Sequence, residues 1–170
     1  HESLFIMAEL IQANVISGDA RTVLEDAMNA AFAKVDEVVA NSATTQTVPK
    51  LVGTTAVDDF IDGILAEFDA ASEAKKMEII MTQKWVSTFG DPFDQYNDYR
   101  RTGYPVLADP NGPSPEYQLD NGDAWPLNDS ETTLTRPYQV SLFWPQAELN
   151  VNENAPAQKD ATTYKIFWDN

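Results

Sequence analysis

Two adjacent arginines, Arg100 and Arg101, have the most distinctive chemistry in this chain, just before Thr102-Gly103-Tyr104-Pro105. A guanidinium pairs with carboxylates through two hydrogen bonds and stacks on aromatic rings. With 27 acidic residues in the chain, both arginines have partners available. Neighbouring side chains of an extended segment point to opposite sides. We therefore expect one arginine to reach inward and the other to lie at the surface, and we interpret both, with Tyr104, as structural ties between this loop and the preceding helix rather than ligand contacts.

Residues for acid–base or nucleophilic catalysis are scarce. The single histidine is His1 and cysteine is absent, so this chain excludes a histidine-based triad and a cysteine nucleophile. Carboxylates are abundant, which leaves a glycosidase-type pair open as an alternative. So many acids produce chance pairs, however, and we interpret them as solvated surface and helix caps. The chain is expected to be non-enzymatic.

A short acidic loop is the best candidate for a cofactor. Asp120 and Asp123 flank Asn121-Gly122 and offer the hard oxygen ligands that calcium prefers. Their spacing does not match the twelve-residue calcium loop, and such loops are usually turns stabilised by their own side chains. We expect no cofactor, with calcium at Asp120 and Asp123 as the alternative.

Aromatic residues carry the case for ligand binding, because flat rings stack on the apolar faces of sugars. Tyr117 and Trp125 lie in the polar, turn-rich segment 109–131 and are the candidate exposed platform. Trp85 lies on the apolar face of a predicted helix, which indicates a core position. In Phe143-Trp144-Pro145 we expect one ring to be buried and the other not.

The net charge of −16 limits the partners. Such an acidic surface repels phosphate backbones and anionic lipid, so nucleic acid and electrostatic membrane docking are not expected. Neutral partners such as oligosaccharides or polysaccharides are not penalised. The absence of cysteine excludes disulfides and thiolate metal sites within this chain, and no apolar run approaches the roughly 20 residues that span a bilayer.

The first half of the chain is predicted to form two helical hairpins. Apolar residues recur at helical spacing over residues 2–16, 19–39, from 55 onward, and 72–89, with Asp19 and Ser72 at helix starts. The second of these helices is expected to bury one stripe, formed by Leu24, Ala27, Met28, Ala31, Val35 and Val38. Residues 40–54 read as a loop. The hairpins resemble tetratricopeptide pairs, although the 34-residue period is not met.

The second half has a different composition. Nine of the ten prolines follow residue 90, and only brief extended pieces occur, at 139–142 and 164–168. We expect a loop-rich region that wraps over the helices through its aromatic side chains. The predicted fold is mostly α, one domain over 1–170, with helical hairpins in 1–89, irregular loops in 90–170 and few short strands. An apolar pattern already running at Leu4 favours the C-terminal part of a larger protein.

Three motifs resemble the SusD/RagB family of outer-membrane nutrient-binding lipoproteins of Bacteroidetes. Glu78–Trp85 is similar to the family's "I-x-x-Q-K-W" helix, and Asp98–Pro105 is similar to its "D-x-R-R-T-G-x-P" loop. The segment from Arg136 to Asn150 resembles its "P-R-R-x-x-Y-P-x-x-E-x-x-x-N" segment. There the chain departs from the pattern, because Phe143-Trp144-Pro145 replaces Tyr-Pro and Arg136 stands alone.

The resemblance implies a mostly helical, tetratricopeptide-containing lipoprotein that is exposed at the surface of the outer membrane. It also implies a partner, a TonB-dependent transporter of the SusC type, to which the lipoprotein delivers glycans. The lipid anchor would lie in an N-terminal part missing from this chain, and the family's glycan platform is built largely outside these helices. The alternative is a helical-repeat protein–protein interaction scaffold without direct sugar binding.

Overall fold

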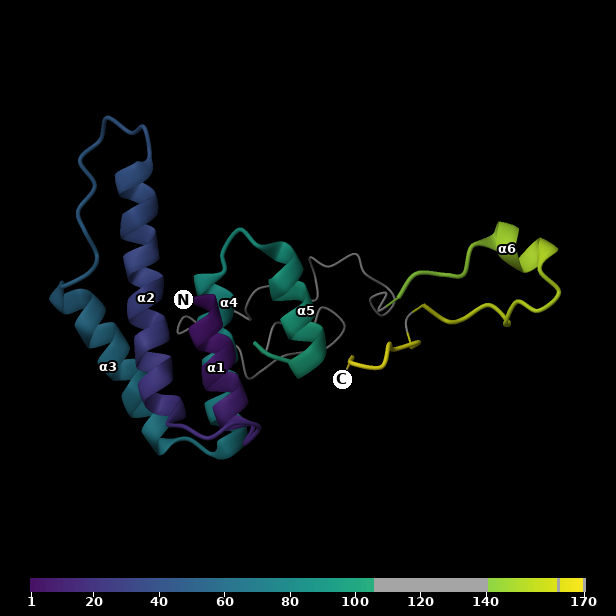
Figure 1. Ribbon diagram of the computed structural model, residues 1–170, viewed down its shortest axis with the longest axis horizontal. Coiled ribbons are helices and arrows are strands. Elements are labelled where there is room, and N and C mark those ends of the chain that lie inside the picture. The colour runs from purple at the N-terminus through teal and green to yellow at the C-terminus, as the bar shows by residue number, and fades with distance from the viewer. Residues whose placement is uncertain (106–140, 162, 170) are drawn as a thin grey trace, which may run out of the picture. The chain divides into compact units, whose positions relative to one another are not determined.

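The computed structural model describes residues 1–105, 141–161 and 163–169 (Figure 1). The chain divides into two compact units, His1–Tyr99 with Gly103–Pro105, and Arg100–Thr102 with Val106–Asn170. The described residues form six helices: α1 (Glu2–Gln12), α2 (Ala20–Asn41), α3 (Thr55–Ala70), α4 (Glu73–Ser87), α5 (Pro92–Thr102) and α6 (Gln146–Val151). Residues 141–142 and 164–168 contain no strand. The predicted mostly α fold class is confirmed.

Local capping explains where the first helices begin. Asp19 accepts a hydrogen bond from the backbone N–H of Arg21 at 3.1 Å, and Ser72 accepts one from Lys75 at 3.3 Å. Asp19 therefore occupies the N-cap position expected of it, and Ser72, which was expected at a helix start, is an N-cap as well; in both, a short polar side chain satisfies an otherwise unpaired donor. Thr54 caps α3 in the same way.

The end of α1 differs from its prediction. The helix ends at Gln12 rather than at residue 16, because Asn14 adopts a left-handed conformation with φ 58°. The N–H of Val15 then bonds to Leu10 O at 2.9 Å, and the N–H of Asn14 bonds to Ile11 O at 2.9 Å. This pair of bonds is the Schellman arrangement that closes a helix. Asparagine, which tolerates this conformation, supplies the stop that Gly18 was expected to supply.

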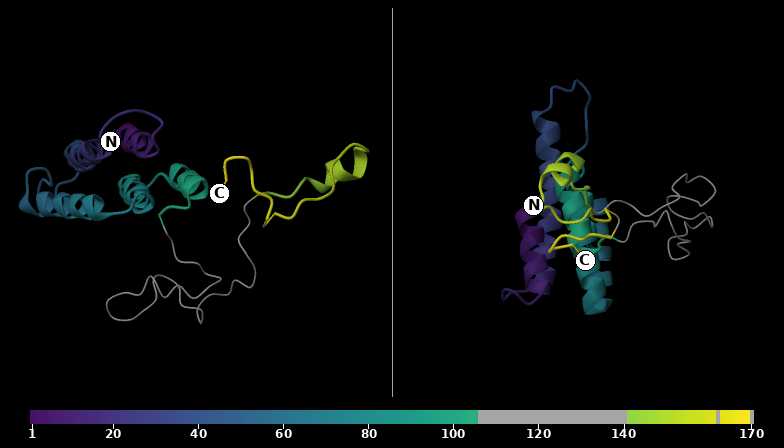
Figure 2. Two further views of the ribbon diagram at one scale, coloured as in Figure 1. Left: turned by 90° about the horizontal axis from the view of Figure 1, so that it is seen from below. Right: turned by 90° about the vertical axis from the view of Figure 1, so that its right-hand side faces the viewer.

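The core lies among the first four helices. α1 packs on α2 and α4, and α3 packs on α2 and α4 (Figure 2). Small residues such as Ala8 and Ala27 are fully buried, which lets α1 and α2 approach closely. The core cluster consists of Phe5, Ala8, Ala20, Leu24, Ala27, Met28, Val57, Ile61, Leu65, Phe68, Ile79 and Ile80. Two helical hairpins are thus joined into one core, as the apolar periodicity predicts.

The apolar stripe of α2 is only half covered. Leu24, Ala27 and Met28 are buried, but Val35 is 49% exposed and Val38 is 57% exposed. The prediction that these two valines lie in the core was wrong. The physical reason is length, because α2 has 22 residues and its neighbour α1 has 11.

Residues 91–103, predicted as loop, contain helix α5. Asp91 caps it by accepting from the N–H of Asp94 at 3.4 Å, and Pro92 occupies the first turn, where no N–H is needed. Gly103 ends the helix in the left-handed conformation, at φ 74°. Arg100 and Arg101 therefore lie in the last turn of a helix, and the expectation of an extended segment with alternating side chains was wrong.

The 42–54 connection is anchored by one carboxylate. Asp36 accepts hydrogen bonds from the backbone N–H groups of Leu51 at 2.9 Å and Val52 at 3.0 Å. Both bonds lower the pKa of Asp36, and the bond from Leu51 has the larger effect.

Among the described residues, no helix combines the length and the apolar character needed to cross a bilayer.

Candidate functional site

Polar side chains from four helices line a cleft of about 370 Å³ at one end of the first unit, here called the polar cleft. The turn between α1 and α2, the first turn of α2 and the junction of α3 with α4 meet there. The lining residues are Ile11, Gln12, Asn14, Gly18, Asp19, Ala20, Arg21, Phe68, Asp69, Glu73 and Lys76. The turn reaches this position because Gly18 lies against Ile11, where a Cβ would come within 2.6 Å of Ile11 Cδ1.

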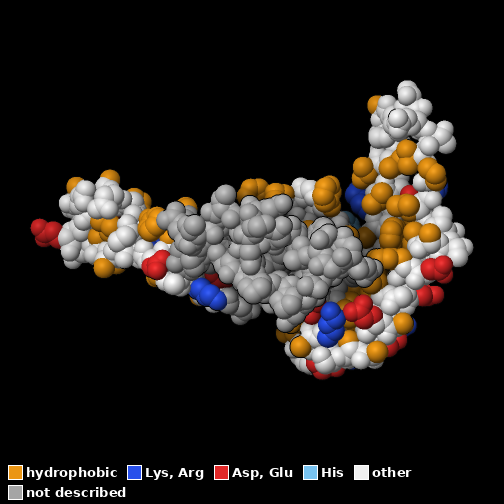
Figure 3. Space-filling view, turned by 180° about the vertical axis from the view of Figure 1, so that it is seen from behind, with side chains coloured by type: hydrophobic (Ala, Val, Ile, Leu, Met, Phe, Trp, Pro, Cys, Tyr) orange, Lys and Arg blue, Asp and Glu red, His pale blue; other side chains and the backbone are white. Residues whose placement is uncertain are grey.

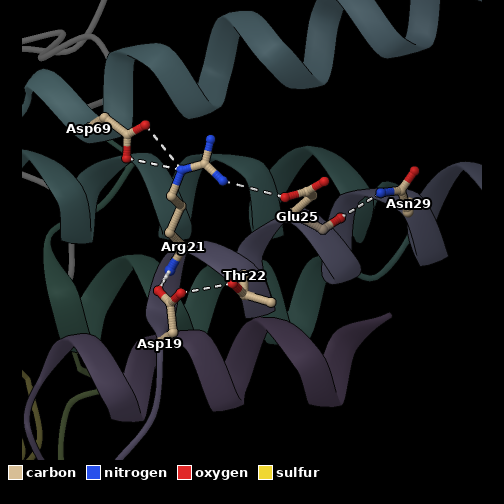
Figure 4. A network of polar contacts seen from close by, with 6 residues as sticks. All are labelled: Asp19, Arg21, Thr22, Glu25, Asn29 and Asp69. Carbon is tan, nitrogen blue, oxygen red and sulfur yellow. Dashed lines mark hydrogen bonds and ion pairs between the residues drawn. The ribbon is translucent and has the colours of Figure 1, made fainter.

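Arg21 organises one side of the polar cleft (Figure 4). Its Nε donates to both carboxylate oxygens of Asp69 at 3.0 Å, and its Nη1 lies 3.5 Å from Glu25. The hydrogen bond to Asp69 raises the pKa of Arg21. Asp19 accepts from the Thr22 hydroxyl at 2.8 Å, and this bond lowers the pKa of Asp19. Both groups are therefore fully charged at neutral pH.

Glu73 organises the other side. Its carboxylate accepts hydrogen bonds from Gln12 Nε2 at 2.8 Å and from Lys76 Nζ at 2.9 Å. Both bonds lower the pKa of Glu73, and the bond from Lys76 has the larger effect. Lys76 Nζ also lies 5.6 Å from the centroid of the Phe68 ring. Phe68 is only 4% exposed, so the surface that the cleft offers to a ligand is mainly its polar and charged rim.

This arrangement suits recognition better than catalysis. Arg21 and Asp69 have side chains 41% and 54% exposed, so their ion pair contributes little to stability and can exchange partners at low cost. The cations of the rim are matched by carboxylates, which favours an uncharged ligand with many hydroxyl groups. Within the described ranges, no group of three or more His, Asp or Glu side chains is placed to hold a metal ion.

The predicted motif residues around Trp85 form a separate network. Lys84, only 5% exposed, places its Nζ 2.6 Å from Asp98 Oδ2. Gln95 Nε2 donates to the backbone oxygen of Trp85 at 2.7 Å, and the Thr88 hydroxyl donates to Lys84 O at 3.0 Å. The Trp85 side chain is half-buried rather than fully in the core. This network joins α4 to α5.

Two contacts of Arg100 lie within the second unit. Its Nη2 pairs with Asp169, and its guanidinium lies 5.2 Å from the centroid of the Trp168 ring. The Arg100 and Asp169 side chains are 12% and 4% exposed, so this is a buried ion pair, and the predicted tie of the arginines to the preceding helix stays a prediction. Arg101 and Tyr104 are half-buried, which leaves their predicted structural role open.

A small aromatic cluster also lies in the second unit. The Trp144 and Tyr164 rings meet edge to face with centroids 6.4 Å apart, and Lys159 Nζ lies 4.3 Å from the Trp144 centroid. Gln158 holds the Trp144 backbone by bonds to its N–H and its oxygen. Phe143 is 56% exposed and Trp144 is half-buried, so neither ring is fully buried, although one of them was expected to be.

The predicted ligand residues Tyr117 and Trp125 and the calcium candidates Asp120 and Asp123 lie outside the described residues. The polar cleft, in turn, was missed by sequence reasoning. Arg21 and Asp69 are 48 positions apart, so no local spacing indicates that they meet. The helix-start signals of Asp19 and Ser72 and the helix stop expected at Gly18 were the sequence features that pointed to this end of the unit.

Comparisons with known proteins show which family and which solved structure this chain is similar to. The chain is similar to the crystal structure of a SusD homologue from Bacteroides fragilis, with 26% identity and a TM-score of 0.57. The match covers 89% of this chain and 29% of the homologue, so the chain spans under a third of that protein's length. No curated protein matches the chain. The model of a family described as SusD-like, starch-binding and associating with the outer membrane matches residues 1–126, and the chain therefore belongs to the SusD-like family.

Proposed function

We propose that this chain is part of a non-enzymatic outer-membrane lipoprotein that binds glycans and passes them to a TonB-dependent transporter. The family match over residues 1–126 carries the proposal, because that family is described as starch-binding and associated with the outer membrane. The solved homologue is more than three times longer than its matched part. Glycan capture, lipid anchoring and the transporter partnership are therefore proposed for the whole protein to which these residues belong.

The chemistry of the chain supports a neutral, hydroxyl-rich ligand. A net charge of −16 disfavours anionic ligands. The polar cleft adds paired hydrogen-bond donors and acceptors, which suit the hydroxyl groups of a sugar. Tyr117 and Trp125 are proposed as the stacking platform of the whole site, because their turn-rich segment is the most polar of the chain.

The proposal includes no catalytic step. In the polar cleft, Asp19 and Glu73 have lowered pKa values, so neither is suited to act as a general acid at neutral pH. No cofactor is proposed as essential. Calcium at Asp120 and Asp123 stays a secondary proposal, tested by a calcium titration of the Asp120→Asn variant.

Titration calorimetry of the natural gene product tests the ligand. Maltoheptaose is the probe and cellohexaose, which differs in linkage, is the comparison. We expect saturable binding of maltoheptaose, weakened at least about fivefold by Trp125→Ala, because loss of one stacked ring removes roughly 1–3 kcal/mol. Tyr96→Ala is the control, since Tyr96 is a 50% exposed tyrosine of α5.

Unchanged affinity of Trp125→Ala and Tyr117→Ala for maltoheptaose would contradict the proposed stacking platform. Absence of binding to any oligosaccharide would contradict sugar recognition and favour the interaction scaffold. The partnership has its own test, which is affinity purification from outer membranes. We expect a β-barrel transporter to co-purify in stoichiometric amount, and its absence would contradict the transporter partnership.

A further inference from the structure

The charged side chains that line the polar cleft are unequal in number. Three lining residues are acidic, Asp19, Asp69 and Glu73, and two are basic, Arg21 and Lys76. The pKa values of Asp19 and Glu73 are lowered and that of Arg21 is raised, so these groups keep their charges at neutral pH. The cleft therefore has one more negative charge than positive charges. Figure 3 shows further acidic side chains on the outer surface of the first unit, in keeping with the net charge of −16.

Carboxylates surround the cation of Arg21 (Figure 4). Both oxygens of Asp69 accept from its Nε at 3.0 Å, and Glu25, just outside the cleft, lies 3.5 Å from its Nη1. Asp69 by its hydrogen bond, and then Glu25 and Asp19 by their charges, raise the pKa of Arg21. A hydroxyl group of a ligand can accept from the guanidinium and donate to these carboxylates, whereas a carboxylate of a ligand can only accept. An acidic ligand would therefore meet repulsion beside Arg21.

The cation of Lys76, in contrast, is matched by one carboxylate. Its Nζ lies 2.9 Å from Glu73 Oε1, and no other carboxylate in the described part of the chain forms an ion pair with it. The Glu73 side chain is 77% exposed and the Lys76 side chain is 24% exposed. Glu73 can therefore be replaced without disturbing the packed core. Loss of its charge would leave the Lys76 ammonium unmatched at the wall of the cleft and would make the numbers of cations and carboxylates there equal.

We propose that the polar cleft is a sugar subsite that accepts an uncharged hexose and discriminates against its uronic acid, and that Glu73 sets this specificity by neutralising Lys76. The inference rests on the proposed function and narrows its ligand class. A hexose and its uronic acid have the same ring hydroxyl groups and differ at C6, where a carboxylate replaces a hydroxymethyl group. Only charge therefore separates the two ligands, and an excess carboxylate in the site is the repulsive element that specificity of this kind requires.

A fluorescent dye beside the cleft reports binding at this place in the natural gene product. The chain has no cysteine, and Ser17 is an exposed residue of the turn between α1 and α2 that does not line the cleft, so Ser17→Cys carries the dye. The probes are methyl α-D-glucopyranoside and the corresponding methyl α-D-glucopyranosiduronate, with sodium acetate as the control for added salt. We expect the glucoside to bind at least about fivefold more tightly than the uronate, the effect of one charge–charge contact in a solvent-exposed site.

Substitutions of the ion pair test the residue to which the specificity is assigned. In Glu73→Gln we expect the ratio of the two affinities to fall to about one, because Lys76 is then free to attract the uronate. Adding Lys76→Met to Glu73→Gln restores one excess carboxylate and should restore the ratio of the parent protein. Glu37→Gln is the matched control, since Glu37 forms an i,i+3 pair with Lys34 at 3.1 Å, is 60% exposed and does not line the cleft. This control should keep the ratio of the parent.

Three results would each overturn the inference: a dye that responds to neither probe, equal affinities for both probes in the parent protein, or an unchanged ratio in Glu73→Gln. Calorimetry with maltoheptaose separates these results from failure of the proposed function. If the natural gene product binds maltoheptaose while the dye does not respond to the glucoside, the cleft is no sugar subsite and glycan binding stands. If no oligosaccharide binds and the dye does not respond, both proposals fail.

Discussion

Lys84 shows how a single charged residue can hold two elements together. It lies on the apolar face of α4 beside Ile80 and Met81, and it is 5% exposed. Its ammonium is 2.6 Å from Asp98, whose side chain is 16% exposed. A buried charge is tolerated only when it is paired. The lysine of the "Q-K-W" motif therefore requires the aspartate of the "D-x-R-R" motif, which gives the two motifs one structural explanation.

Replacing Lys84 by methionine tests this pair. We expect the free energy of unfolding to fall by about 3 kcal/mol, because Asp98 loses its ammonium partner in a poorly solvated position. Urea denaturation measures the change. Lys34→Met is the matched control, since Lys34 pairs with Glu37 at 3.1 Å in solvent. That substitution should cost less than about 0.5 kcal/mol. Equal losses of unfolding free energy in the two variants would show that the buried Lys84–Asp98 pair contributes no more to stability than an exposed pair.

At the scale of elements, helix ends determine where side chains go. Gly103 terminates α5 with φ 74°, and its N–H bonds to Tyr99 O at 2.8 Å. Gly63 is different, because it lies within α3 and a Cβ added there would meet nothing within 4 Å. Only Gly103 is favoured by its backbone conformation, because that conformation is left-handed, whereas Gly63 has the ordinary conformation of a helix interior.

Alanine substitution should separate these two glycines. We expect Gly103→Ala to lower the free energy of unfolding by about 1–2 kcal/mol, the cost of a left-handed alanine. Gly63→Ala should raise it by roughly 0.5–1 kcal/mol, because alanine loses less backbone entropy in a helix. Thermal melts followed by circular dichroism measure both changes. A destabilising Gly63→Ala would indicate that something packs against α3 at that position.

At the scale of the whole molecule, carboxylates link stability to pH. The pKa values of Asp19, Asp36 and Glu73 are lowered by hydrogen bonds and cations in the fold. Groups of this kind contribute stability above their unfolded pKa, 3.8 for aspartate and 4.5 for glutamate, and this contribution is lost as pH falls through the folded value. Glu2 behaves in the opposite way, because its hydrogen bond with Asp94 raises its pKa and favours the fold at low pH.

The Asp36→Asn variant tests one of these contributions. We expect the variant to be less stable than the parent chain at pH 7, because an amide replaces one of the two oxygens that accept from Leu51 and Val52. The difference should shrink as pH falls below 3.8, where the aspartate of the parent also becomes protonated. Melting temperatures between pH 2.5 and 7 measure it. A difference independent of pH would contradict the assigned role of the carboxylate.

A feature could be predicted from the sequence when the residues that form it lie close together along the chain. Asp19 was identified as a cap and Ser72 as a helix start because the donor that each satisfies lies two or three residues away. Helix α5 was missed because Asp91-Pro92 begins a turn as readily as a helix, and its few apolar residues give no buried stripe. The aromatic and calcium predictions at Tyr117, Trp125, Asp120 and Asp123 stay predictions, because they lie outside the described residues.

The sequence by itself determined the helical hairpins, the caps and the family motifs, since all three depend on residue types at short, regular spacing. Only the tertiary structure decided that Arg21 meets Asp69 across 48 residues, that Lys84 is buried against Asp98, and that Val38 is uncovered. The physical reason is that burial depends on which helices lie side by side and how long each is. Periodicity marks an apolar face along α2, but the 11-residue length of α1 sets where its cover ends.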